Sequence, residues 1–284
     1  MNHHAADKRI EAARQQWDAA ADGWDAHSPM LRNWLSAPTR ILFEAAAIAE
    51  GKCVLDVAAG AGDQTLMLAE RVGPEGRITA TDLSPTQIER LKQNAADSGL
   101  DTVEAIVADA QLPLGKADVF DAAVCRLGLM LMPEPARCIS SVHAALKPGA
   151  RFSAMVFAEP GDNPCIRVLM PTALRHASLP PGDPFEPGGL LSLGRPGHLQ
   201  RLFDLAGFQE VSTFSIEAPF RLASVDDYLA FLRTAAAPVI SVLSALEPSK
   251  REAAWQDMRE QLSVFTSSDG WIGPSTLLIT VGRK

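Results

Sequence analysis

The chain has 284 residues, of which 47% are hydrophobic, enough for one large domain or one domain with an elaborated cap. Its formal net charge is −8, and this excess of acidic groups argues against a nucleic-acid partner, whose phosphates it would repel. The first residues lack the basic and apolar parts of a signal peptide, and no uncharged apolar run reaches membrane-spanning length. We therefore expect a cytoplasmic protein with no membrane span.

Two helical patterns occupy the N-terminal part. Residues 5–22 are rich in alanine and in charged side chains, which favours a helix. Residues 37–50 predict a second helix, with Ser36 as its N-cap, Pro38 near its start and Gly51 just past its end.

A short loop after residue 57 carries the strongest functional signal. The apolar run 54–57 contains Asp56 and opens into a loop of small residues that includes Gly60 and Gly62, followed by an amphipathic segment over 64–72. This pattern predicts a buried strand, a tight turn and a helix. Because glycine has no Cβ, a ligand can lie against the bare backbone, and nucleotide-like cofactors bind at such a turn in α/β sheets.

Two phosphate-binding loops fit this segment poorly. A P-loop needs a lysine after its last glycine, and none follows Gly62. A dinucleotide fingerprint needs a third glycine or alanine, where this chain has Thr65 or Asp63, depending on the frame. The Asp56 carboxylate would also repel a pyrophosphate. It suits a ligand with an amine or a positive centre, and S-adenosylmethionine has both.

The following predicted strands end in residues that suit the same ligand. Residues 77–82 form a strand that ends in Asp82, whose carboxylate can accept both ribose hydroxyls. Residues 103–111 contain a third strand, with Asp109 placed for the adenine amino group. Residues 120–127 are nearly apolar, as a central parallel strand should be. Residues 146–153 supply a helix end, a Pro-Gly turn and a fifth strand.

The C-terminal half begins with a stretch dense in proline and glycine, residues 159–197. Its part 179–189 cannot form a regular element, and its apolar residues indicate a packed loop. The remaining predicted elements are a helix over 198–206, a sixth strand over 208–220, a helical region over 223–266 that Pro238 and Pro248 interrupt and Ser224 caps, and a closing strand over 276–282.

Five segments together resemble the class I S-adenosylmethionine-dependent methyltransferases, closest to the small-molecule branch typified by ubiquinone/menaquinone-biosynthesis methyltransferases. They are VLDVAAGAGD, ITATDLSPTQIERLKQNA, IVADAQLPL, FDAAVCRLGLMLMPEP and LKPGARFSAMVF, in family order between about residues 50 and 158. The resemblance implies an α/β fold: a Rossmann-like, seven-stranded, mostly parallel sheet with helices on both faces and an antiparallel last strand, plus an N-terminal helical lid and helical cap insertions.

The same resemblance implies one structural domain in four parts. These are an N-terminal helical lid over 1–50, a cofactor-binding core over 51–158, a cap loop and helix over 159–207, and C-terminal strands with a helical insertion over 208–284.

The resemblance also implies which residues hold the cofactor. The set is Asp56, Ala58, Ala59, Gly60 and Gly62 at the methionine end, Asp82 at the ribose, Leu83 and Gln87 beside the adenosine, Asp109, Ala110 and Gln111 around the adenine, Arg126 and Leu127 near the sulfonium, and Trp24 in the lid. Ala58 stands where the family usually has its first loop glycine, and Trp24 replaces a usual tyrosine, so only an indole donor remains there.

Methyl transfer from a sulfonium is an in-line displacement in which the protein mainly aligns the acceptor and excludes water. The sequence therefore identifies no catalytic residue, and it predicts no metal. Arg126 either lines the pocket or pairs with a structural carboxylate, and the Met-rich loop 127–133 suits an adaptable apolar acceptor site.

The function predicted is methyl transfer to a small, largely apolar molecule through oxygen, nitrogen or carbon. A neutral or cationic acceptor is weakly favoured. The alternatives are a non-catalytic S-adenosylmethionine-binding regulatory protein and a nicotinamide-dependent oxidoreductase. The acceptor's identity and the oligomeric state stay open.

Overall fold

The computed structural model describes residues 3–115 and 117–284, with side chains described from residue 10 onward. Its main sheet has seven strands in the order β3-β2-β1-β4-β5-β10-β6. Their bounds are β1 Cys53–Val57, β2 Arg77–Asp82, β3 Val103–Val107, β4 Phe120–Arg126, β5 Leu146–Phe157, β6 Gln209–Glu217 and β10 Thr276–Arg283. β10 pairs antiparallel with both β5 and β6, whereas the other pairings are parallel. The predicted sheet, including its antiparallel last strand, is confirmed.

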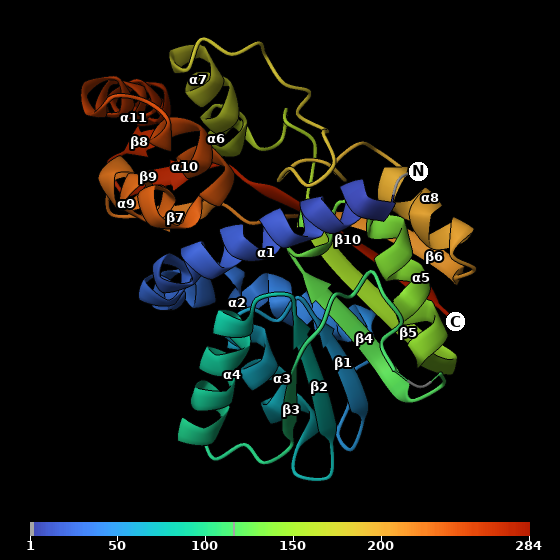
Figure 1. The fold of residues 1–284 in the computed structure, drawn as a ribbon. Coiled ribbons are helices and arrows are strands. Elements are labelled where there is room, and N and C mark those ends of the chain that lie inside the picture. The colour runs from blue at the N-terminus through green and yellow to red at the C-terminus, as the bar shows by residue number, and fades with distance from the viewer. Residues whose placement is uncertain (1–2, 116) are drawn as a thin grey trace.

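Helices cover both faces of this sheet (Figure 1). α2 and α3 contact each other on one face, α5 and α8 contact each other on the other, and α4 packs on β2 and β3. Their bounds are α2 Ser28–Ala45, α3 Asp63–Val72, α4 Pro85–Asp97, α5 Pro135–Ala145 and α8 His198–Leu205. The strand order reverses between β2 and β4, on either side of β1, and such a reversal opens a crevice at the carboxyl ends of the strands.

The first helix, α1 (His3–Ala26), runs across that end of the sheet, with the cap helices on its other side (Figure 1). Two residues of the α4 region hold it there. Ser84 donates its hydroxyl to Asp18, and the Arg90 guanidinium pairs with Asp22 and, at 3.1 Å, with Asp25.

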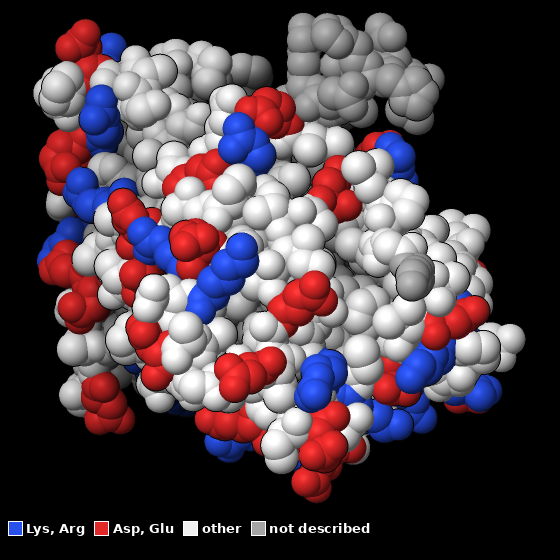
Figure 2. Space-filling model, turned by 60° about the horizontal axis from the view of Figure 1, so that its bottom comes forward, with Lys and Arg blue, Asp and Glu red and all other residues white. Residues whose placement is uncertain are grey.

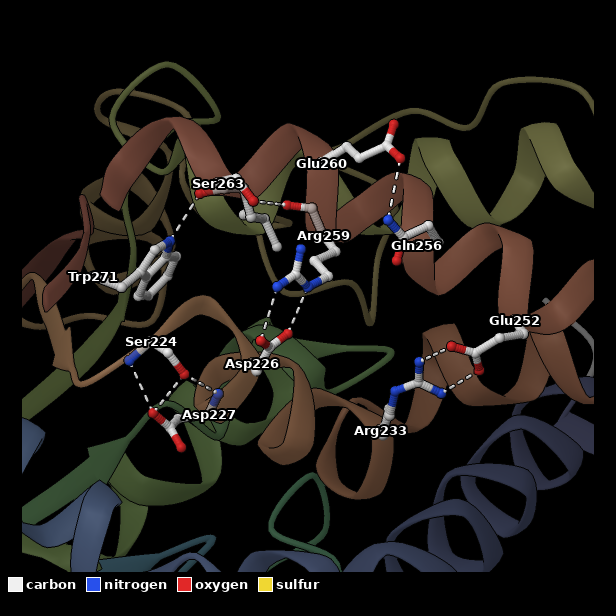
Figure 3. Close-up of polar contacts among 11 residues, drawn as sticks. Ser224, Asp226, Asp227, Arg233, Glu252, Gln256, Arg259, Glu260, Ser263 and Trp271 are labelled. Carbon is white, nitrogen blue, oxygen red and sulfur yellow. Dashed lines mark hydrogen bonds and ion pairs between the residues drawn. The ribbon is translucent and has the colours of Figure 1, made fainter. Parts of the chain in front are cut away.

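The cap combines helices with a second sheet of order β7-β9-β8. Its elements are α6 Pro164–Arg167, α7 Leu169–His176, β7 Phe220–Leu222, α9 Val225–Ala235, α10 Ala237–Ser244, α11 Pro248–Leu262, β8 Thr266–Ser267 and β9 Gly270–Gly273, with the 3₁₀ turn η2 Ser263–Phe265. Arg259 forms a bidentate pair with Asp226, which joins α11 to α9, and the buried Trp271 indole donates to the Leu262 carbonyl at 2.8 Å (Figure 3). Ser224 caps α9 in a capping box with Asp227, as its position predicted.

Several element boundaries differ from the sequence expectation. α2 begins at Ser28 rather than after Ser36, and Pro38 lies inside it, because burial of one apolar face outweighs the lost backbone hydrogen bond. Residues 164–176 are helical, although the surrounding stretch was expected to be a packed loop. The predicted strand over 208–220 ends at Glu217; Pro219 has no N–H for a ladder, and Phe220 starts a strand of the other sheet.

On the face shown in Figure 2, acidic and basic side chains drawn in colour are interspersed, with no large area of one sign. Among the helices of the described residues, none combines the length and apolar character needed to cross a bilayer.

Candidate cofactor and acceptor site

The loop between β1 and α3 bends through left-handed backbone conformations. Ala58, Gly60 and Gly62 have φ of 55°, 58° and 96°. A Cβ added at Gly60 would meet nothing within 4 Å, so this backbone is bare toward the cavity. A Cβ at Gly62 would lie 2.8 Å from the Leu91 Cγ, so this glycine allows the loop to pack on α4. The two glycines therefore serve different purposes.

Asp56 lies beneath that loop and is fully buried. Its carboxylate accepts hydrogen bonds from the Gln64 amide and, at 2.7 Å, from the Thr65 hydroxyl. Burial raises the pKa of Asp56 to about 7, although these hydrogen bonds and the charge of Arg126 lower it. Asp56 thus supports the loop from below rather than facing the cavity.

This raised pKa predicts a pH-dependent stability. Between pH 5.5 and 7 the carboxyl is ionised in the unfolded chain but mostly protonated in the folded one, so stability falls as pH rises and levels off above the folded pKa of about 7. Relative to Asp56→Asn, which does not titrate, the wild-type free energy of unfolding should fall by about 2 kcal/mol from pH 5.5 to 7.5. Urea unfolding of both proteins across this range measures it; a constant difference would place the pKa near its ordinary value.

Asp82 stands at the end of β2 with both oxygens already oriented. Oδ2 accepts from the Gly60 N–H and Oδ1 from the Ser84 N–H, each at 2.9 Å. Burial raises the pKa of Asp82, and these backbone donors oppose the rise. The carboxylate keeps acceptor capacity beyond these two bonds, and the residue lines the cavity.

The end of β3 is organised by Asp109 and Gln111. The Asp109 Oδ1 accepts from the Gln111 backbone N–H at 2.9 Å and from its side-chain amide at 3.0 Å. The Gln111 carbonyl oxygen accepts from the Glu134 N–H at 2.8 Å, which ties this edge to the start of α5. Both Asp109 and Gln111 line the cavity.

Two cavity-lining glutamines have a buried oxygen with no hydrogen-bond partner among the described residues. These are the Oε1 atoms of Gln64 and Gln87. Buried polar atoms are nearly always paired in native proteins, so unpaired ones beside a cavity indicate a place for a polar ligand or water.

On the lid side, Trp24 contributes its ring to the cavity but not its N–H. The indole nitrogen donates to the Ala235 carbonyl in the cap at 3.2 Å. The ring makes edge contacts with Trp17 and Phe231, at centroid distances of 6.2 and 5.7 Å. The donor expected for the cofactor is therefore already used to hold α1 against α9.

Removing the indole donor should weaken the attachment of α1 to α9. Trp24→Phe keeps an aromatic ring but leaves the Ala235 carbonyl without its partner, so we expect a loss of about 1 kcal/mol in the free energy of unfolding. The matched control is Trp17→Phe. It makes the same substitution at a neighbouring tryptophan whose indole N–H forms no hydrogen bond with the described residues. Urea unfolding measures both, and an equal loss in the two variants would contradict the role of the Trp24 hydrogen bond.

The end of β4 supplies the opposite wall. Leu127 has a φ of 57°, and a Cβ added at Gly128 would lie 2.4 Å from the Ala58 Cβ, so the loops after β4 and β1 touch here. Arg126 lines the cavity and donates from Nη1 to the buried Thr39 hydroxyl at 2.9 Å.

The cavity gathers residues from α1, α2, four strand ends and the turn η1 (Leu129–Leu131). All sequence-predicted cofactor residues line it except Asp56 and Gly62: Trp24, Ala58, Ala59, Gly60, Asp82, Leu83, Gln87, Asp109, Ala110, Gln111, Arg126 and Leu127.

Sequence reasoning missed the contribution of α2 and of the first residue of α3. Leu31 and Leu35 line the cavity, and so does Asp63, which accepts from Ser28 and Arg32, each at 2.8 Å. The apolar spacing of residues 28–45 was a usable signal for the longer helix. Among the described residues, no group of three potential ligands is placed to hold a metal ion.

Three histidines contact other parts of the protein outside the cavity. His176 contacts Asp257 at 2.9 Å, His27 contacts the Gly23 carbonyl at 2.8 Å, and His143 packs against Phe208. The described lining of the cavity includes no histidine.

Comparison with known proteins agrees with this geometry. Residues 48–164 match the model of a methyltransferase domain. The chain is 26% identical to the ubiquinone/menaquinone biosynthesis C-methyltransferase of Marinomonas sp. over 160 residues, covering 54% of this chain and 62% of the relative. It is 33% identical to the 2-phytyl-1,4-naphtoquinone methyltransferase of Nostoc sp. over 141 residues, covering 46% and 60%. The match thus spans less than two thirds of these relatives' own length.

The structural similarity to a solved methyltransferase covers more of the chain than these sequence matches do. The phosphoethanolamine N-methyltransferase 2 of Haemonchus contortus, solved with phosphomonomethylethanolamine and S-adenosylhomocysteine, superposes with a TM-score of 0.58 at 13% identity, covering 93% of this chain and 60% of that one. Residues 48–164 therefore match the methyltransferase-domain family, and the chain has a Rossmann-like fold that it shares with this solved N-methyltransferase.

Proposed function

We propose that the chain binds S-adenosylmethionine in this cavity and catalyses methyl transfer to a small, largely apolar molecule. The observation that carries the proposal is the continuity of one cavity. It runs from the carboxylates of Asp82 and Asp109, past the bare backbone of Gly60, to an apolar wall that includes Leu31 and Leu131.

The residues present fit this cofactor. Asp82 has acceptor capacity for ribose hydroxyls, and Asp109 and Gln111 would face the adenine. Gly60 leaves room at the backbone, and the unpaired oxygen of Gln87 offers a further acceptor. When bound, the cofactor supplies an already activated methyl group. The protein's work is then to position the acceptor and to exclude water, with α1 lining one side of the site.

The two alternative functions gain no support. The matched relatives are named as methyltransferases, which does not favour a non-catalytic binding protein. A nicotinamide cofactor would need the third glycine of its fingerprint, and that position is occupied by Thr65 or Asp63.

The same proposal covers the cellular setting and the organisation of the chain. An acidic chain favours a small-molecule acceptor over nucleic acid, and we propose a cytoplasmic location. The four proposed parts of this one domain are a helical lid over 1–50, the cofactor core over 51–158, a cap loop and helix over 159–207, and C-terminal strands with a helical insertion over 208–284. Contacts of α1 with α4, α9 and α10 support a lid that bridges core and cap.

Calorimetry with S-adenosylmethionine and with NADH tests the cofactor. Micromolar binding of the first alone supports the proposal, and binding of NADH alone would overturn it. Incubating cell extracts with the enzyme and radiolabelled cofactor then tests methyl transfer, because label should appear in a small organic-soluble product. Absence of any labelled product alongside tight cofactor binding would favour the regulatory alternative.

A further inference from the structure

Arg126 is a cation at the cavity wall that forms no ion pair with a described residue. Its Nη1 donates to the Thr39 hydroxyl, and no carboxylate of the described residues lies within the 4.0 Å that defines an ion pair. A guanidinium has five N–H donors, so most of them are available to a ligand.

The two carboxyl groups that raise the pKa of Arg126 have other hydrogen-bond partners. The negative charges of Asp63 and Asp56 both raise the pKa of Arg126. However, Asp63 is held by Arg32 and Ser28, and Asp56 by side chains beneath the loop. Burial lowers the pKa of Arg126, but a guanidinium stays charged in proteins. A buried cation without a paired anion is costly, and an incoming anion would remove that cost.

The cavity that Arg126 lines also has an apolar lining, and Arg126 ends a strand that lies away from the expected adenosine end. β4 flanks β1 on the side opposite β2 and β3, the strands that lead to Asp82 and Asp109. Leu31, Leu35 and Met132 line the cavity together with Arg126. Among the described lining residues, the cavity therefore combines one cation, Arg126, with apolar side chains.

We propose that Arg126 is the acceptor-recognition residue and binds an anionic oxygen, a carboxylate, phenolate or enolate, on an otherwise apolar methyl acceptor. This inference rests on the proposed function and refines it, because the sequence weakly favoured a neutral or cationic acceptor. The Met-rich loop and α2 would contact the acceptor's hydrocarbon part.

An anionic acceptor also explains how the reaction proceeds without a histidine base in the described cavity lining. The acceptor's proton passes to water before attack, and Arg126 stabilises the resulting negative charge. The acceptor's electron pair then forms a bond to the methyl carbon as the carbon–sulfur bond breaks, and that bond's electron pair stays on the sulfur of the neutral thioether.

The test compares two probes of equal shape, 2-naphthoate and 2-naphthamide, by calorimetry on protein saturated with S-adenosylhomocysteine. The wild type should bind the carboxylate at least tenfold more tightly than the amide. Arg126→Met should lose this preference, whereas Arg126→Lys, which retains the charge, should keep part of it. Thr39→Val, which removes the hydroxyl that positions the guanidinium, should reduce the preference severalfold.

Equal binding of the two probes to the wild type, or no binding of naphthoate, would overturn the proposal without any variant. A second source of the anion is the methionine carboxylate of the cofactor. In that case Arg126→Met would weaken S-adenosylhomocysteine but not methylthioadenosine, which lacks the carboxylate, and the acceptor role would be wrong. Failure of the proposed function would give a different result from failure of this inference. The wild type would then not bind S-adenosylhomocysteine at all.

Discussion

Replacing Gly62 with alanine should lower the free energy of unfolding by about 2 to 5 kcal/mol, the sum of left-handed backbone strain and overpacking. The residue has a φ of 96°, and its new methyl group would lie 2.8 Å from the Cγ of Leu91. Leu91 is only 1% exposed within the core, so it cannot move without repacking α4 against the loop. Urea unfolding monitored by circular dichroism measures the loss.

Gly60→Ala is the matched control for this prediction. It carries similar backbone strain, with a φ of 58°, but its methyl group would meet no protein atom within 4 Å. Its stability loss should therefore stay at about 1 to 2 kcal/mol, while its affinity for S-adenosylmethionine falls because the methyl group enters the cavity. Equal destabilisation in the two variants, with unchanged affinity at Gly60, would contradict the division of roles between these glycines.

Asp82→Ala should weaken S-adenosylmethionine binding by about 1.5 to 3 kcal/mol, the usual scale for hydrogen bonds to a charged group. The carboxylate that would accept the ribose hydroxyls also accepts from the N–H groups of Gly60 and Ser84. The variant therefore loses both the ligand contact and the orientation of the loop. Calorimetry measures the change in dissociation constant as about a 10- to 150-fold increase.

Asp101→Ala controls for the loss of one negative charge from the protein. Asp101 is exposed and follows α4 on the loop to β3, away from the described cavity lining. Its affinity for the cofactor should match the wild type. The Asp82 variant should be assayed below its own unfolding temperature, and an unchanged dissociation constant there would remove Asp82 from the site.

The helix α1 forms one side of this cavity, which Trp17 and Trp24 line. α1 crosses the carboxyl end of the sheet and is fixed on both sides, to the α4 region through Ser84 and Arg90 and to α9 through Trp24. Under the proposed function, a helix fixed in this way would keep water from the methyl acceptor.

The sequence by itself determined the sheet and the positions of its functional residues. Alternation of apolar strands with amphipathic helices predicts parallel strands, and the carboxyl ends of parallel strands meet at one edge. Asp82 and Arg126 each end such a strand and Asp109 lies two residues past the end of another, so their convergence on one cavity follows from local pattern.

Tertiary structure decided which of those side chains are available to a ligand. The Trp24 indole is bonded to a carbonyl 211 residues away, and the Arg126 guanidinium to a hydroxyl 87 residues away. Asp56, one residue before the end of β1, is buried and bonded to Gln64 and Thr65 instead of lining the cavity. Such pairings depend on distances between remote segments, and no local pattern of residues encodes them.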